Sequence, residues 1–226
     1  MKSLFAILLL LSTHTMAQKL LIPEKVRFLA LGDSYTIGES VTVDERWPMQ
    51  LMDSLHRRGL DCLKPNIIAT TGWRTDDLDH AMRKAKLKPD YNLVSLLIGV
   101  NNYFQGKTVE SYAPEFEALL RKAIDLAGGN KSHVFVLSIP DYGYTPFGKD
   151  KQEKISSGID TFNEMNKSIT GKLGVKYYSI TEISRRGLKE TDLVAADGLH
   201  PSGKQYSEWV KLILNDMTVE KKEEDN

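Results

Sequence analysis

The sequence predicts an α/β fold in which a central, mainly parallel sheet of five strands is covered by helices on both faces. Three observations predict it. Short apolar runs alternate with helical patterns, the 226 residues are 41% hydrophobic and 27% charged, and no repeat or low-complexity linker divides them. That length suits one medium-sized domain with a substantial core. Strand–helix alternation is typical of parallel sheets, whose strands are joined by crossover helices.

Residues 1–17 have the layout of a secretory signal peptide. Lys2 precedes an apolar run over 4–11, and Thr15-Met16-Ala17 offers small residues for cleavage after Ala17. The run is too short to span a bilayer. We therefore expect a secreted or periplasmic protein with no stable membrane insertion after cleavage. The alternative is an uncleaved leader that is kept as an anchor.

Five apolar runs predict the strands, which we expect at Val26–Leu31, Asn66–Thr70, Leu93–Ile98, Val134–Ile139 and Val175–Ser179. Apolar residues recur at helical spacing over 47–55, 116–127, 155–169 and 206–214. Pro48 is tolerated in the opening turn of the first helix, and Gly128-Gly129 ends the second. We expect residues 18–216 to form the domain and the charged residues 217–226 to form a solvated tail.

Charge and cysteine content exclude several classes of function. The chain has 30 basic and 30 acidic side chains and lacks a basic run, so we expect no nucleic-acid partner. Its single cysteine, Cys62, excludes an intramolecular disulfide, a Cys-rich zinc site and an iron–sulfur cluster. We expect this thiol to be buried.

Polar and glycine residues follow successive strands of the predicted sheet. Gly32-Asp33-Ser34 follow the first strand, Gly72 follows the second and Asn101 follows the third. Ligands bind outside the carboxyl ends of parallel strands, so we expect a hydroxyl, a glycine amide and a carboxamide to meet at one edge. Each feature alone has an ordinary explanation as a helix cap, a turn glycine or a loop asparagine. Their joint placement favours catalysis.

The spacing Asp-x-x-His occurs three times, and only the last occurrence lies in a predicted loop. The first two fall in helical stretches, where residues at i and i+3 are ordinary surface neighbours; they are Asp53/His56 and Asp77/His80. The third, Asp197/His200, is bracketed by Gly198 and Pro201. Functional side chains are common in loops. We therefore take His200 as a candidate base and Asp197 as its orienting carboxylate.

Taken together, these residues resemble the SGNH/GDSL hydrolase family over essentially the whole predicted domain. The four similar blocks are Gly32-Asp33-Ser34, Gly72, Gly99-Val100-Asn101 and Asp197-Gly198-Leu199-His200-Pro201. The resemblance implies a flavodoxin-like three-layer α/β/α sandwich and an ester hydrolase that needs no metal or cofactor. It also implies Ser34 as the nucleophile, His200 as general base and then acid, and Asp197 as the group that orients His200. The implied oxyanion hole combines the amides of Ser34 and Gly72 with the side chain of Asn101.

Two positions depart from the usual family pattern. Asn102 stands where an aspartate is common, and Tyr35 rather than leucine follows Ser34. Thr36 lies two residues after Ser34, so the chain lacks the Gly-x-Ser-x-Gly elbow of α/β-hydrolases.

Aromatic residues flank the expected centre and give the only indication of substrate. Tyr35, Trp73 and Tyr103 are the candidate substrate-binding residues, where they would line an acyl slot or stack on a sugar; core packing is the equal alternative. Further aromatics nearby are Phe104, Tyr142, Tyr144 and Phe147. We expect a small-molecule or glycan ester as substrate, preferably a short-acyl or acetyl ester. The alternatives are a lysophospholipase or thioesterase-like lipolytic enzyme, and a catalytically silent glycan- or lipid-binding module.

Overall fold

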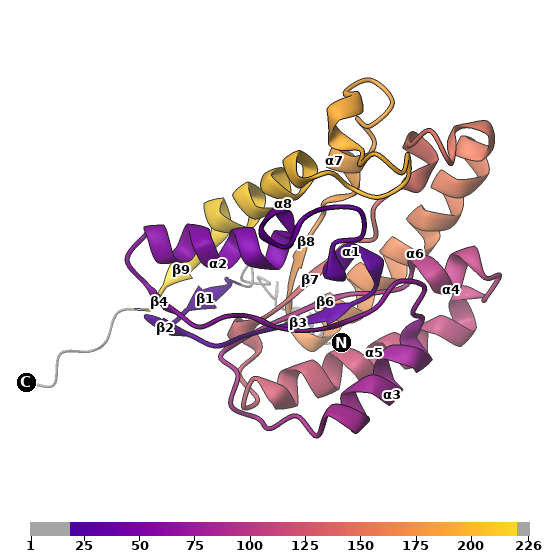
Figure 1. Cartoon of the computed structure of the whole chain (residues 1–226). Helices are drawn as coiled ribbons and strands as arrows, with labels where there is room; N and C mark the ends of the chain where they lie inside the picture. Colours follow the sequence, from indigo (N-terminus) through magenta and orange to yellow (C-terminus); the bar gives the residue numbers. More distant parts are fainter. Residues whose placement is uncertain (1–18, 221–226) are drawn as a thin grey trace, which may run out of the picture.

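The computed structural model describes residues 19–220, with a five-stranded parallel sheet at their centre (Figure 1). Every neighbouring pair in this sheet is parallel, and the strand order is β5-β3-β6-β7-β8, as in flavodoxin-like folds. The predicted five strands are therefore confirmed. Their bounds are β3 (Phe28–Gly32), β5 (Asn66–Ala69), β6 (Leu93–Leu97), β7 (Val134–Leu137) and β8 (Lys176–Tyr178).

Helices cover both faces of the sheet and complete the three layers. Figure 1 shows α2 (Trp47–Arg57) and α8 (Gly203–Asp216) on one face, and α3 (Thr75–Ala85), α5 (Val109–Leu126) and α6 (Gln152–Leu173) on the other. Three short helices follow strands at their carboxyl ends: α1 (Ser34–Ile37), α4 (Val100–Phe104) and α7 (Thr181–Ser184). Single 3₁₀ turns lie at Val43–Glu45, Lys131–His133, Tyr142–Tyr144, Lys149–Lys151 and Thr191–Leu193.

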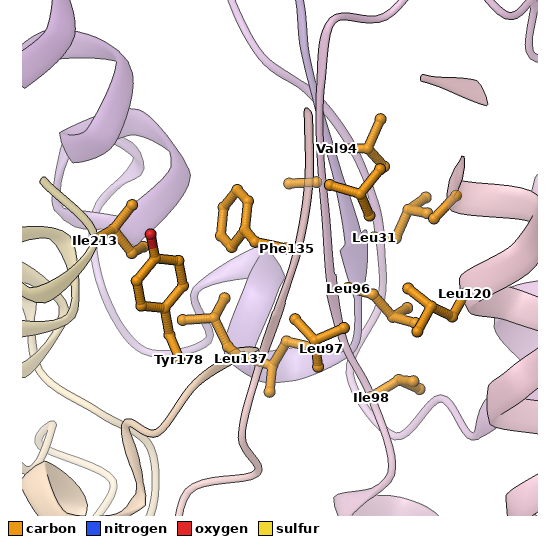
Figure 2. Packing of buried hydrophobic residues seen from close by; sticks show 14 of the residues in the cluster. Leu31, Val94, Leu96, Leu97, Ile98, Leu120, Phe135, Leu137, Tyr178 and Ile213 are labelled. Carbon is orange, nitrogen blue, oxygen red and sulfur yellow. The ribbon is translucent and has the colours of Figure 1, made fainter. Parts of the chain in front are cut away.

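The core lies between the sheet and the two helical layers, because both faces of the central strands are apolar and buried. Figure 2 shows Phe135 and Leu137 of β7 on the same side as Tyr178 and Ile213, while Leu96 of β6 lies beside Leu120. Each fully buried side chain of this size contributes about 1.5–3 kcal/mol through removal of apolar surface from water. The helices thus fix the sheet, and the sheet edge that carries the polar residues is rigid.

Two short parallel pairs extend the fold beyond the main sheet. β1 (Leu21–Ile22) pairs with β9 (Thr218–Val219), and β2 (Lys25–Val26) pairs with β4 (Asp61–Cys62). Residues 218–219 fall within the expected tail, residues 217–226; they pair with β1 and are exposed to solvent. The many charges that follow them concealed this strand in the sequence.

Other expectations about the chain's ends and its thiol have mixed outcomes. The expected leader, residues 1–17, lies outside the described residues. Cys62, which was expected to be buried, is half-buried in β4. Within residues 19–220, no helix combines the length and the apolar character needed to cross a bilayer.

Candidate active site

Ser34 begins α1 directly after β3, at the carboxyl end of the sheet. The preceding residue, Asp33, is buried and caps this helix, because its Oδ1 accepts a hydrogen bond from the Tyr35 amide at 3.0 Å. The helix ends after one turn at Gly38, whose backbone is left-handed (φ 73°). This short, capped turn fixes the direction in which Ser34 points.

A small cavity of about 80 Å³ lies against Ser34 at the carboxyl-end edge of the sheet. It brings together a hydroxyl, a carboxamide and an imidazole from distant parts of the chain, as the sequence predicted. Its wall is otherwise mainly apolar and aromatic. The lining residues are Ser34, Tyr35, Val100, Asn101, Phe104, Tyr142, Phe147, Leu199 and His200.

His200 and Asp197 form a short hydrogen bond beside this cavity. His200 Nδ1 donates to Asp197 Oδ2 at 2.6 Å, so Nε2 is the ring nitrogen left for Ser34. Asp197 Oδ1 accepts the amides of Leu199 and His200 at 2.9 and 3.0 Å, and Ser40 Oγ donates to Oδ2 at 2.6 Å. Burial would raise the pKa of Asp197, but the hydrogen bonds from Ser40, His200 and the two amides hold it well below its ordinary value. The carboxylate stays ionised and can stabilise a protonated imidazole.

Asn101 lies in α4 and fastens the turn that carries Gly72. Its Nδ2 donates to the carbonyl of Trp73 at 2.9 Å, and Gln105 Nε2 donates to the carbonyl of Gly72 at 3.2 Å. An amide group has two hydrogens, so the second hydrogen of Asn101 is free to serve the cavity. Gly72 has a positive φ of 83° and an exposed position. Gly72 is not one of the described residues that line the cavity. Its turn nevertheless lies next to Asn101, because Asn101 bonds to the carbonyl of the following residue, Trp73.

Of the three candidate substrate-binding residues, Tyr35 is among the described residues that line the cavity. Trp73 and Tyr103 are not. Tyr103 instead donates its hydroxyl to the carbonyl of Lys154 at 2.9 Å and packs its ring on Phe162. Trp73 is partly buried against the core. Both side chains therefore have the core-packing role that was the alternative for them.

Three other aromatic side chains form the outer wall of the cavity, which we call the aromatic rim: Phe104, Tyr142 and Phe147. Their ring centroids lie 6.1–6.4 Å apart. Phe104 and Phe147 are 58% and 57% exposed, unusually high for phenylalanine. An exposed aromatic surface beside a polar centre is suited to binding the apolar part of a ligand.

A buried ion pair holds the loop that carries Tyr142. Asp141 is fully buried; its Oδ1 accepts the Gly143 amide at 2.9 Å, and its Oδ2 accepts Arg185 Nε at 3.0 Å. A buried charge that loses its partner is costly, so this loop is fixed by strong local interactions. These contacts hold the turn that places Tyr142 in the rim.

The structure explains the departure at Asn102. Its Oδ1 accepts the Thr75 amide at 3.2 Å, and its Nδ2 donates to Thr75 Oγ1 at 2.7 Å. The Thr75 hydroxyl in turn donates to Glu115. An aspartate at position 102 would lose the Nδ2 donor and bring a second carboxylate close to Glu115. Asparagine is therefore matched to the acidic neighbour in this chain.

Replacement of Asp33 by asparagine is expected to flatten the dependence of stability on pH. Burial raises the pKa of Asp33 to about 7, against hydrogen bonds from the Tyr35 and Asp33 amides that lower it. Oδ2 has no hydrogen-bond partner among the described residues. The folded state therefore keeps a proton that an unfolded aspartic acid loses at about pH 4. Folding stability should fall as pH rises from about 4 to about 7, and the variant should lack this loss.

Urea unfolding of both proteins across this pH range measures the effect. The matched control is Asp53→Asn, which changes an exposed aspartate paired with Arg57. Parallel curves for wild type and Asp33→Asn would contradict the prediction.

Comparisons with known proteins support the fold and identify the family. A family model described as the GDSL-like lipase/acylhydrolase family matches residues 30–207. No curated relative matches the chain. A G-D-S-L lipolytic family member from Veillonella parvula has 17% identity, covers 84% of this chain and 96% of its own, and has a TM-score of 0.66. Axe2, an acetylxylan esterase from Geobacillus stearothermophilus, has 15% identity, coverages of 86% and 95%, and a TM-score of 0.65.

Esterase EstA from Pseudoalteromonas sp. has a similar structure, with 17% identity, coverages of 85% and 96%, and a TM-score of 0.60. These likenesses extend over nearly the full length of the other chains. At such identities they establish the fold of this chain.

Proposed function

The chain belongs to the GDSL-like lipase/acylhydrolase family of carboxylic ester hydrolases, and from that premise we propose that it hydrolyses short-acyl esters through an acyl-enzyme on Ser34. The size of the cavity beside Ser34 is the observation that carries this proposal. A cavity needs about 10–15 Å³ of space to hold one water molecule, so a cavity of about 80 Å³ has room for roughly five to eight non-hydrogen atoms. An acetyl or similarly short acyl group fits that space.

In the proposed first step, Ser34 Oγ attacks the carbonyl carbon of the ester. His200 Nε2 takes the hydroxyl proton, since Nδ1 is already bonded to Asp197. The carbonyl π bond breaks, and its electron pair moves to the oxygen. The Ser34 and Gly72 amides and the second hydrogen of Asn101 Nδ2 are the proposed donors to that oxyanion. Preorganised donors are effective here because the cavity wall is largely apolar.

In the following steps, the oxyanion collapses and expels the alcohol, which takes its proton from His200. A water molecule then attacks the acyl-enzyme while His200 removes its proton. The carboxylic acid departs, and Ser34 regains its hydrogen. Asp197 keeps its charge throughout and stabilises the imidazolium that forms twice in the cycle.

The aromatic rim is the proposed site for the alcohol part of the ester. Two of its rings are more than half exposed, so they offer flat apolar surface next to the cavity. Aromatic surfaces of this kind suit the apolar faces of sugar rings. The name of the structurally similar Axe2 refers to an acetylated carbohydrate. We therefore propose an acetylated carbohydrate as the preferred substrate, and a site of action outside the cytoplasm on the basis of the expected leader.

Hydrolysis of p-nitrophenyl esters of increasing acyl length tests the substrate class. We expect kcat/KM to be highest for acetate and to fall beyond about four carbons, because longer chains exceed the cavity. The exposed rings of Phe104 and Phe147 favour one rival, a lipolytic enzyme whose acyl chain lies along the rim. A preference for octanoate or longer would establish that rival in place of the acetyl esterase.

A fluorophosphonate probe tests whether Ser34 is the nucleophile. Wild-type protein should be labelled covalently, and Ser34→Ala should not be, because the probe reacts only with an activated serine. The matched control is Ser111→Ala, an exposed serine that donates to the carbonyl of Thr108, and it should be labelled like the wild type. Absence of labelling in all three would favour a glycan- or lipid-binding module without catalysis.

A further inference from the structure

Ser40 contacts the same carboxylate oxygen as His200. Its Oγ donates to Asp197 Oδ2 at 2.6 Å, and His200 Nδ1 donates to that oxygen at 2.6 Å. We propose that Ser40 is a positioning residue, whose hydroxyl holds the Asp197 carboxylate in the orientation that aligns His200 with Ser34. This inference rests on the proposed function, because it requires His200 to act as the base.

The backbone of Ser40 supports a dedicated role for its side chain. Its φ is +64°, and Lys86 is the only other non-glycine residue of the described chain with a positive φ. The left-handed conformation is unfavourable for an L-residue other than glycine, because its Cβ lies too close to the following carbonyl oxygen. Such strain persists where the surroundings enforce it and is frequent at functional sites. Here the conformation brings the hydroxyl to Asp197, although glycine would fit the backbone more easily.

Hydrogen bonds on both sides of Ser40 fix the segment in which it lies. On one side, the Thr71 hydroxyl donates to the carboxylate of Glu39. On the other side, the Thr42 amide and hydroxyl donate to Glu45 at 3.0 and 2.8 Å. The side chain of Ser40, though exposed, is therefore presented from an anchored segment. A water molecule that replaced the hydroxyl would not be attached to this segment, so its hydrogen bond to Asp197 would have no fixed direction.

Loss of the hydroxyl would leave Asp197 Oδ2 less firmly oriented toward His200 and would change the charge that the imidazole meets. The amides of Leu199 and His200 still hold Asp197 Oδ1. Oδ2 would then share its negative charge with the imidazole alone, so the protonated imidazole would be held more strongly. His200 should therefore lose its proton only at a higher pH. Two other titratable groups lie close to this carboxylate: Tyr206, whose pKa burial raises well above its ordinary value, and Asp33, whose pKa burial raises to about 7. Both are present in the wild type and in the variants, so a difference between the pH profiles reports the loss of the hydroxyl.

The test measures kcat/KM for p-nitrophenyl acetate from pH 5 to pH 9 in Ser40→Ala and Ser40→Gly. We expect kcat/KM of both variants to be about 3- to 10-fold lower at neutral pH, since one charge-assisted hydrogen bond is lost. The ascending limb of the pH profile, where kcat/KM rises as the base loses its proton, should move upward by about 0.3–0.5 pH unit. Glycine adopts φ +64° without strain. If the two variants have the same pH profile, the effect is due to the hydroxyl and not to backbone strain. If Ser40→Ala is unstable, Ser40→Gly alone tests the proposal.

A further variant separates positioning from loop order. Thr71→Val releases the anchor at Glu39 and keeps the Ser40 hydroxyl, so the ascending limb of its pH profile should stay at the wild-type pH. The role of Ser40 would be overturned if the ascending limb stayed at the wild-type pH in both Ser40→Ala and Ser40→Gly. It would also be overturned if Thr71→Val shifted the limb as far as these two variants do. Absence of fluorophosphonate labelling at wild-type Ser34 would overturn the proposed function instead, so the two failures are distinguishable.

Discussion

Replacement of His200 by alanine is expected to lower kcat for ester hydrolysis by roughly 10⁴- to 10⁶-fold, because Ser34 loses the base that activates it. The residual rate comes from binding and from the oxyanion donors. His200 is partly buried and lies in a loop, so the change should leave the fold intact. Steady-state kinetics with a short-acyl ester, together with a circular dichroism spectrum of the variant, measures the effect.

Two other histidines provide matched controls for this prediction. His56 in α2 and His80 in α3 each follow an aspartate at the same spacing as His200, and neither is among the described residues that line the cavity. His56→Ala and His80→Ala should keep kcat within about threefold of the wild type. A loss of several orders of magnitude in either variant, with His200→Ala active, would show that the base had been assigned to the wrong pair.

Asn101→Ala is expected to lower kcat by about 10²- to 10³-fold, or about 2.7–4 kcal/mol of transition-state stabilisation, with little change in KM. The reason is that the amide hydrogen is needed when negative charge develops on the ester oxygen, and contributes little to ground-state binding. Measurement of kcat and KM separately for a short-acyl ester checks this split. A rise in KM at unchanged kcat would assign Asn101 to substrate binding.

Gln105→Ala is the matched control for Asn101. Gln105 ties α4 to the Gly72 turn, as Asn101 does through Trp73, but it is not among the described residues that line the cavity. Its loss should cost less than about fivefold in kcat, since the turn keeps its second tie. Equal losses in the two variants would mean that Asn101 acts only by holding the turn.

Most of the fold and the position of the centre could be predicted because they depend on local patterns. Runs such as Leu93–Leu97 are apolar apart from Ser95 and are found fully buried between helices. The α/β architecture then requires Ser34 and Asn101 to meet at the carboxyl ends of adjacent strands. The loop position of His200 distinguished it from the two helical histidines. These inferences needed no knowledge of side-chain packing.

The parts that could not be predicted depend on contacts between residues far apart in the sequence. Nothing local to Ser40 indicates that it donates to Asp197, and its positive φ has no signal in a non-glycine residue. Tyr103 and Phe104 are adjacent aromatics in one short helix, yet one packs inward on Phe162 and the other joins the rim. Which of the two faces the ligand is decided by the packing of α4 against α6.

Helix lengths were underestimated where a residue disfavours helix without ending it. α5 begins at Val109, well before the predicted 116, and contains Pro114. Proline lacks an amide hydrogen, but near the start of a helix this loss is small. The Thr108 side chain caps the helix by accepting the Ser111 amide. A cap and a tolerated proline together extend the helix beyond its apolar stripe.

The pairing of β1 with β9 brings the two ends of the domain side by side. A short linker between residues near 21 and 219 would close the backbone into a ring without distorting the main sheet, so new termini could be opened in a surface turn such as Gly128-Gly129. The same adjacency suits insertion of the whole domain into a loop of a host protein. This family member is thus a natural starting point for circular permutation.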